Sequence, residues 1–140
     1  MKKAISALNT MNAALKIKET DWIATTAYYA GYFALYSLLM KAGVKSEIHD
    51  CSIAIARLLA KEGIIDEESV QDITQSKQTR IDMQYYVRTQ IDEAGIASNA
   101  KKARRFVLEM EKAIENMSTE QIRNIRAQLR HMQSGHQNRT

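Results

Sequence analysis

The sequence predicts an all-α fold, an antiparallel up-and-down bundle of five or six helices. The 140 residues contain no proline and only five glycines, and apolar residues recur at three- and four-residue steps along most of the chain. No segment alternates apolar and polar residues as a half-buried strand does. With 45% hydrophobic residues, one domain of this length can bury a core without a metal or a disulfide.

The N-terminal half is expected to hold three helices, over residues 3–18, over residues 20–42, and from Ser46 to Gly63. Ser46 is the expected N-cap of the third helix, and Gly43 and Gly63 are the expected stops of the second and third. The apolar stretch 22–40 is interrupted by threonine, serine and several tyrosines. We therefore interpret it as a buried bundle helix and not as a membrane span.

The C-terminal half is expected to hold three more helices. The first covers residues 67–91, with a bend or break at the polar stretch 74–79, and the second begins at Ser98 or Asn99. The last begins at Ser118, with Gln121 three residues later as in a capping box. The expected division is a helical bundle over 1–117, an amphipathic helix over 118–133 and a disordered tail over 134–140.

The formal net charge of +4 is concentrated near the C-terminus. Residues 101–140 hold nine Lys/Arg against four Glu, and residues 1–100 hold eleven Lys/Arg against twelve acidic residues. Such a bias is typical either of a phosphate-binding surface or of an ordinary solvated helix face. The candidate nucleic-acid contacts in this region are Lys101, Lys102, Arg104, Arg105, Arg123, Arg126 and Arg130.

Cysteine usage and the absence of a signal-like segment indicate a cytoplasmic protein. Cys51 is the only cysteine, so no internal disulfide can form, and the chain suits a reducing compartment. The apolar residues of the first twenty positions are spaced rather than continuous, unlike those of a signal peptide. No metal-ligand cluster, phosphate loop or nucleophile motif is present in the sequence, so no cofactor is expected.

Three motifs occur in a recognisable order: TAYYAGYFALYSLLMKAGV in the second helix, Ser46-x-x-His49 after it, and Arg80-Ile-Asp-Met-Gln-Tyr85 further on. In this order they resemble the HEPN superfamily, and more narrowly its small prokaryotic members, over about residues 3–114. The resemblance implies a helical bundle, a homodimer, and association with a small nucleotidyltransferase protein in toxin–antitoxin systems. It also implies that RNA or a nucleotide is a ligand to consider.

The resemblance also identifies candidate catalytic residues. Nuclease-active HEPN proteins use an arginine and a histidine a few residues later, and here Arg80 holds the arginine position while Tyr85 stands at the histidine position. A phenol is a poor general base at neutral pH. His49, in the first turn of a helix that favours the neutral imidazole, is the other candidate base, with helix capping as its alternative role.

The same residues admit non-catalytic roles. Arg80 could bind a phosphate, or it could form a structural ion pair with an acidic residue of a neighbouring helix. Tyr28, Tyr29, Tyr32, Phe33 and Tyr36 form an aromatic ladder that suits a core or a dimer interface better than base stacking. Three functions stay open at this point: a homodimeric interaction module, a divergent metal-independent RNA endonuclease, and a scaffold.

Overall fold

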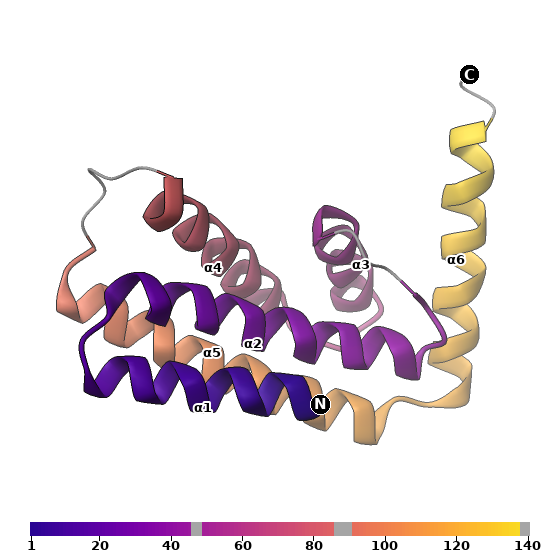
Figure 1. Cartoon of the computed structure of the whole chain (residues 1–140). Coiled ribbons are helices and arrows are strands. Elements are labelled where there is room, and N and C mark those ends of the chain that lie inside the picture. The colour runs from indigo at the N-terminus through magenta and orange to yellow at the C-terminus, as the bar shows by residue number, and fades with distance from the viewer. Residues whose placement is uncertain (46–48, 86–90, 138–140) are drawn as a thin grey trace.

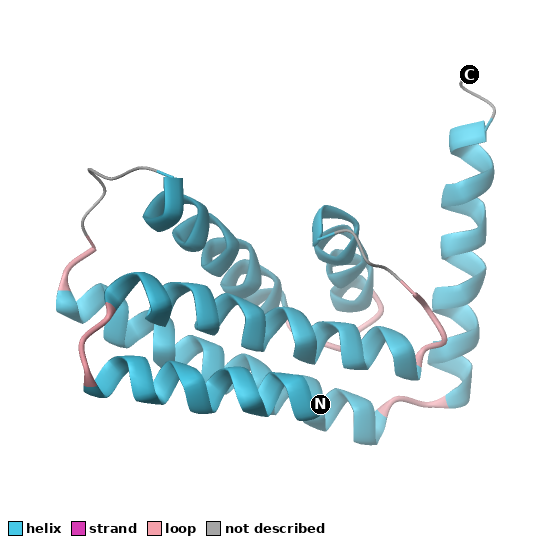
Figure 2. Ribbon diagram, viewed as in Figure 1, coloured by secondary structure: helices cyan, strands magenta, loops and turns pink. Residues whose placement is uncertain are grey.

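The fold is all-α, as predicted. The computed structural model describes the backbone of residues 1–45, 49–85 and 91–137, and the side chains at these positions apart from 49–50 and 133–137. Over these ranges every regular element is a helix (Figure 2). The helices are α1 (Lys2–Lys16), α2 (Thr20–Lys41), α3 (His49–Lys61), α4 (Glu67–Tyr85), α5 (Glu93–Asn116) and α6 (Thr119–Gln137).

Helix α2 is the centre of the bundle. It lies antiparallel to α1, and both run along α5, while α4 and α3 pack on another side of α2 (Figure 1). Helix α6 rises steeply at the end of the bundle where α2 stops (Figure 1). No helix in the described residues is long and apolar enough to cross a membrane.

Small residues on α2 let its neighbours approach closely. The side facing α1, α4 and α5 carries Ala24, Ala27, Ala30, Gly31 and Ala34, all of them buried. A Cβ placed on Gly31 would lie 2.7 Å from Cδ1 of Ile73 and 3.5 Å from Cδ1 of Phe106. A glycine is therefore needed here for close packing against α4 and α5 and not for an unusual backbone angle.

Two of the predicted glycine stops are confirmed. Gly43 and Gly63 both have φ of +72°, the left-handed conformation that favours glycine at a helix end. The amide of Val44 donates to the carbonyl of Leu39 at 2.8 Å, and that of Ile64 donates to Leu59 at 2.9 Å. These bonds satisfy carbonyl groups that the ends of α2 and α3 would otherwise leave open.

The predicted start of the last helix is also confirmed. The Ser118 amide donates to Oε1 of Gln121 at 2.9 Å, and the Gln121 amide donates to Oγ of Ser118 at 3.1 Å. Together these two bonds make the reciprocal pair of a capping box. The predicted cap at Ser46 lies outside the described residues.

Several predicted boundaries are wrong. Helix α4 has no break at residues 74–79, because Asp72 and Ser76 are buried against α5 and keep the polar stretch packed. The residues between Tyr85 and its predicted end near 91 lie outside the described part of the chain. Helix α5 begins at Glu93, well before Ser98, because Asp92 caps it by accepting from the Gly95 amide at 2.7 Å. Helix α6 continues to Gln137, so residues 134–137 of the expected tail are helical.

The N-terminal half of α6 packs on the helical bundle of the same chain. Ile125 is fully buried in the main core, and Ile122 and Leu129 pack against that core. Met132, one turn further, is exposed, and the upper part of the helix projects beyond the bundle (Figure 1).

Candidate functional site

The guanidinium of Arg80, a residue of α4, is stacked on aromatic rings of α2. Its guanidinium carbon is 4.9 Å from the ring centroid of Tyr28 and 5.7 Å from that of Tyr29. Both distances are within the range of a cation–π contact. Tyr28 is 1% exposed, so one face of the guanidinium is removed from water.

The hydrogen bonds of Arg80 stay local. Its Nη1 is 3.5 Å from Oε1 of Gln84, whose Nε2 donates to Oγ1 of Thr25 on α2 at 3.2 Å. Its Nε is buried and has no hydrogen-bond partner. Among the described residues no acidic group pairs with Arg80, so the ion pair considered as its structural role is absent and aromatic packing takes its place.

The other two candidate catalytic residues are placed differently. Tyr85 is the last residue of α4, and its side chain is 71% exposed. The described contacts of Arg80 go to Gln84 and to the α2 tyrosines and do not include Tyr85. His49 is the first residue of α3, and its side chain lies outside the described part of the structure.

The aromatic ladder of α2 divides between the core and the surface. The rings of Tyr28 and Tyr32 stack at 6.3 Å, those of Tyr32 and Tyr36 lie at 6.4 Å, and those of Tyr29 and Phe33 at 5.9 Å. Tyr28 belongs to the core, and the other four are half-buried. The ladder therefore forms the boundary between the bundle and its outer surface.

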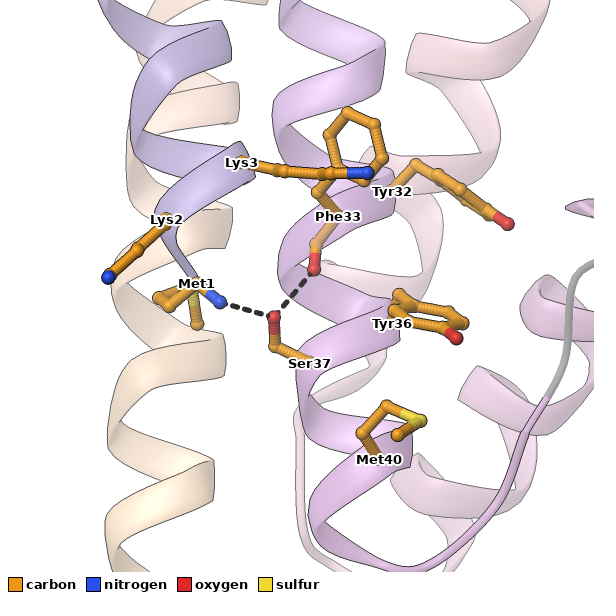
Figure 3. Close-up of a pocket in the computed structure, with 8 residues that line it drawn as sticks. All are labelled: Met1, Lys2, Lys3, Tyr32, Phe33, Tyr36, Ser37 and Met40. Atoms are coloured by element: carbon orange, nitrogen blue, oxygen red, sulfur yellow. Dashed lines mark hydrogen bonds between the residues drawn. The ribbon is translucent and has the colours of Figure 1, made fainter.

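A groove of about 640 Å³ opens on this surface, between the start of α1 and the second half of α2. Figure 3 shows Lys3 reaching over the ring of Phe33, at 5.4 Å from its centroid, with Tyr32 and Tyr36 directed to the other side. The residues that line it are Met1, Lys2, Lys3, Tyr32, Phe33, Tyr36, Ser37 and Met40. Aromatic walls with a lysine rim suit an apolar or aromatic occupant that carries acidic neighbours.

The largest exposed apolar side chains of α2 mark its two ends. Trp22 in the first turn is 62% exposed, and Met40 in the last turn is 51% exposed. The sequence prediction did not identify this pair, because α2 has no polar stripe that would mark its open face.

Much of the basic character of α5 is used inside the bundle. Arg105 forms ion pairs with Glu68 and with the buried Asp72 of α4. The hydrogen bonds to these two carboxylates raise the pKa of Arg105 above its ordinary value. Lys102 donates to Oε1 of Gln75 at 3.0 Å and lies 3.9 Å from Asp72. These side chains join α5 to α4.

The remaining basic candidates are distributed over α5 and α6. Arg104 donates to Oδ1 of Asn12 on α1 at 2.7 Å. Nε of Arg126 donates to the carbonyl of Ala42 at 2.8 Å, which places a cation at the C-terminal end of α2. Lys101, Arg123 and Arg130 are exposed. The predicted phosphate-binding set is thus spread over α5 and α6, and part of it holds helices together.

A polar cleft of about 200 Å³ lies between α4 and α5. Asp72, Ser76, Asn99 and Lys102 contribute to its walls. Oγ of Ser76 and Nδ2 of Asn99 are buried there without hydrogen-bond partners. No group of three or more metal-binding side chains occurs among the described residues.

Comparison with known protein families agrees with this architecture. Residues 1–124 match the family model described as the HEPN domain, which spans α1 to α5 and the first turn of α6. Among curated proteins, no sequence matches the chain. Because the matched region covers most of the chain and the fold is an all-α bundle, this chain belongs to the HEPN domain family.

Proposed function

We propose that this protein is a homodimeric HEPN interaction module that works in the cytoplasm with a small nucleotidyltransferase, in a two-component system of the toxin–antitoxin type. The observation that carries the proposal is the exposed apolar and aromatic face of α2, from Trp22 to Met40. A face of this kind on a single protomer is typical of a protein–protein interface. The nucleotidyltransferase partner is an expectation from family membership.

The position of Arg80 supports an interaction role over catalysis. Its guanidinium is stacked on Tyr28 and Tyr29, and its Nε is buried. A group held in this way stiffens the contact between α4 and α2, whereas a catalytic arginine has to present its donors to a phosphate. Cys51 is the only cysteine and its side chain is exposed, which suits a reducing compartment.

Binding of RNA or nucleotide is a weaker part of the proposal. Lys101 and Arg123 are exposed on α5 and α6 and could contribute together to a phosphate-binding surface. Lys102, Arg105 and Arg126 already contact protein groups. We therefore expect binding that is weak and falls steeply with added salt.

A divergent metal-independent RNA endonuclease is the second candidate. The observation in its favour is the exposed phenol of Tyr85, five residues after Arg80 on the same helix. It predicts RNA cleavage that is lost in both Arg80→Met and Tyr85→Phe. Intact RNA over a wide pH range, with a stable dimer present, counts against it.

The first test is the molar mass in solution by light scattering, for the wild type, Met40→Glu and Leu108→Glu. Met40 on α2 and Leu108 on α5 are about equally exposed, at 51% and 50%. The two substitutions therefore have the same intrinsic cost, and only the first is in the proposed interface. We expect a dimer that Met40→Glu dissociates and Leu108→Glu leaves intact, and a monomeric wild type at every concentration would refute the proposal.

The second test concerns the partner. A tagged copy recovered from the native cells at low and moderate salt should retain a nucleotidyltransferase at near-equal stoichiometry. Recovery of RNA fragments alone would favour the endonuclease.

A further inference from the structure

The arrangement of side chains on the exposed face of α2 indicates which partner would bind there. We propose that a second copy of this chain packs antiparallel on α2 across a two-fold axis at the level of Gly31. In this arrangement Trp22 of each copy inserts into the groove that Tyr36 and Met40 line on the other. The proposal rests on the homodimer of the proposed function and adds the interface and its orientation.

The side chains on this face follow a coiled-coil repeat. Successive steps are four, three, four, three and four residues, and the members are Trp22, Thr26, Tyr29, Phe33, Tyr36 and Met40. Each is exposed or half-buried, whereas the opposite side of α2 is buried in the bundle. A seam with this repeat is the pattern by which one helix packs along another.

The repeat is symmetric about Gly31. Trp22 and Met40 each lie nine residues from it, Thr26 and Tyr36 lie five, and Tyr29 and Phe33 lie two. An antiparallel pair with its axis at this level therefore sets Trp22 against the partner's Met40. It likewise sets Tyr29 against the partner's Phe33. Two-fold dimers use the same patch on both subunits in this self-complementary way.

The groove and the side chain that fits it stand at opposite ends of the helix. Trp22 is in the first turn of α2, and the groove adjoins the second half of this helix. Eighteen residues of helix separate Trp22 from Met40, about 27 Å at 1.5 Å per residue. A chain cannot fill its own groove with its own tryptophan, and a parallel partner would place tryptophan against tryptophan. An antiparallel copy brings the indole and the groove together on both sides of the axis.

The charges favour the same orientation. Exposed Glu19 and Asp21 flank Trp22, and Lys41 follows Met40 in the last turn, with the exposed Lys2 in the groove wall. An antiparallel arrangement places the acidic end of one α2 beside the basic end of the other. The dipoles of the two helices then also point in opposite directions, which is favourable. Lys16 and Lys18 precede Trp22 closely in the sequence, but they are not part of α2. Lys16 is the last residue of α1, and Lys18 lies in the loop between α1 and α2.

Disulfide formation between single-cysteine variants tests the orientation. In a Cys51→Ser background, which removes the free thiol, Trp22→Cys and Met40→Cys are prepared separately, mixed and oxidised. We expect a covalent dimer in the mixture and none in either variant alone. Within one chain the two positions are about 27 Å apart, far beyond disulfide reach, so any link between them joins two chains. Self-linking of Trp22→Cys would show a parallel seam and overturn the proposal.

Fluorescence of the wild type gives an independent measure, because Trp22 is the only tryptophan in the chain. We expect its emission to shift to shorter wavelength as rising concentration forms the dimer, and Trp22→Ala to raise the dimer dissociation constant at least about 30-fold, as for a hot-spot residue. Leu108→Ala is the matched control and should leave the constant unchanged. Circular dichroism verifies that each variant is folded.

The outcomes separate the two proposals. A wild type that is monomeric at every concentration refutes the homodimer, and this interface with it. A dimer whose Trp22 emission does not change with concentration, and in which positions 22 and 40 do not link, refutes only this interface.

Discussion

Replacing Arg80 by methionine tests whether its guanidinium is a structural group. The side chain has two favourable contacts, at 4.9 Å and 5.7 Å from the ring centroids of Tyr28 and Tyr29. Each is worth about 0.5–1 kcal/mol at a partly exposed position. Against them stands the buried Nε without a partner, which costs about 1–3 kcal/mol. Methionine removes both terms and keeps an unbranched apolar stem over the rings.

The gains and the cost nearly cancel. We therefore expect Arg80→Met to change the free energy of unfolding by less than about 1 kcal/mol. Arg80→Ala also removes the aliphatic stem that covers the tyrosine rings and should destabilise by about 1–3 kcal/mol. Urea unfolding followed by circular dichroism measures both, at one fixed protein concentration because a dimer's stability depends on concentration.

A double-mutant cycle isolates the contact itself. Tyr29→Leu combined with Arg80→Met should show a coupling free energy of about 0.5–1 kcal/mol. A coupling of zero, or an Arg80→Ala variant as stable as the wild type, would refute the packing role. An RNA cleavage activity present in the wild type and lost in Arg80→Met at unchanged stability would show that the guanidinium acts chemically.

Three further substitutions test helix ends by urea unfolding. Gly43→Ala and Gly63→Ala each place a side chain at φ of +72°, which costs about 1–2 kcal/mol of stability. Only at Gly43 would the new Cβ collide with Arg126, so Gly43→Ala should cost about 1 kcal/mol more than Gly63→Ala. Equal costs for the two variants would contradict this. Asp66 caps α4 by accepting from the Ser69 amide at 2.7 Å, and hydrogen bonds from Ser69 lower its pKa below 3.8. Asp66→Ala should therefore lower the free energy of unfolding by about 1 kcal/mol at pH 7. This difference between wild type and variant should vanish as the pH falls through the lowered pKa of Asp66, because the protonated carboxyl loses the advantage of the cap. A difference in stability that does not depend on pH would refute this cap.

The glycine stops show which features the sequence alone could predict. A helix that ends in a left-handed residue needs glycine there, and Gly43 and Gly63 both adopt that conformation. The requirement is local, so it can be recognised without knowledge of the fold. Gly95 has a different role, in the first turn of α5 beside the capping Asp92. The start of α5 was predicted at Ser98 or Asn99, several residues after the cap that Asp92 provides.

The polar stretch of α4 could not be interpreted locally. Asp72 and Ser76 are buried, whereas a helical pattern assigns buried positions to apolar residues. Asp72 is tolerated in the interior because Arg105, thirty-three residues away, forms an ion pair with it. Only the packing of α5 on α4 shows that this stretch is a continuous buried face and not a break.

The environment of Arg80 also depends on a distant segment. The order of motifs identified Arg80 as a residue of interest, but its neighbours Tyr28 and Tyr29 are about fifty positions earlier in the chain. An ion pair with an acidic residue of a neighbouring helix was one of the two roles that the sequence left open for Arg80. Helix α2 instead presents aromatic rings at this point, and a guanidinium stacks on them because it is planar and more weakly hydrated than an ammonium group.

Helix α2 is apolar on every side, and this property connects the fold to the proposed assembly. A helix of this composition is normally buried all round, yet in one protomer the face from Trp22 to Met40 stays at the surface. Periodicity could not tell which face would be open, because no polar stripe marks it. The bundle covers the side centred on Gly31, where only small residues permit close approach. The large residues opposite Gly31 are then left for an interface, and their symmetric spacing about Gly31 is what a second copy of the same helix requires.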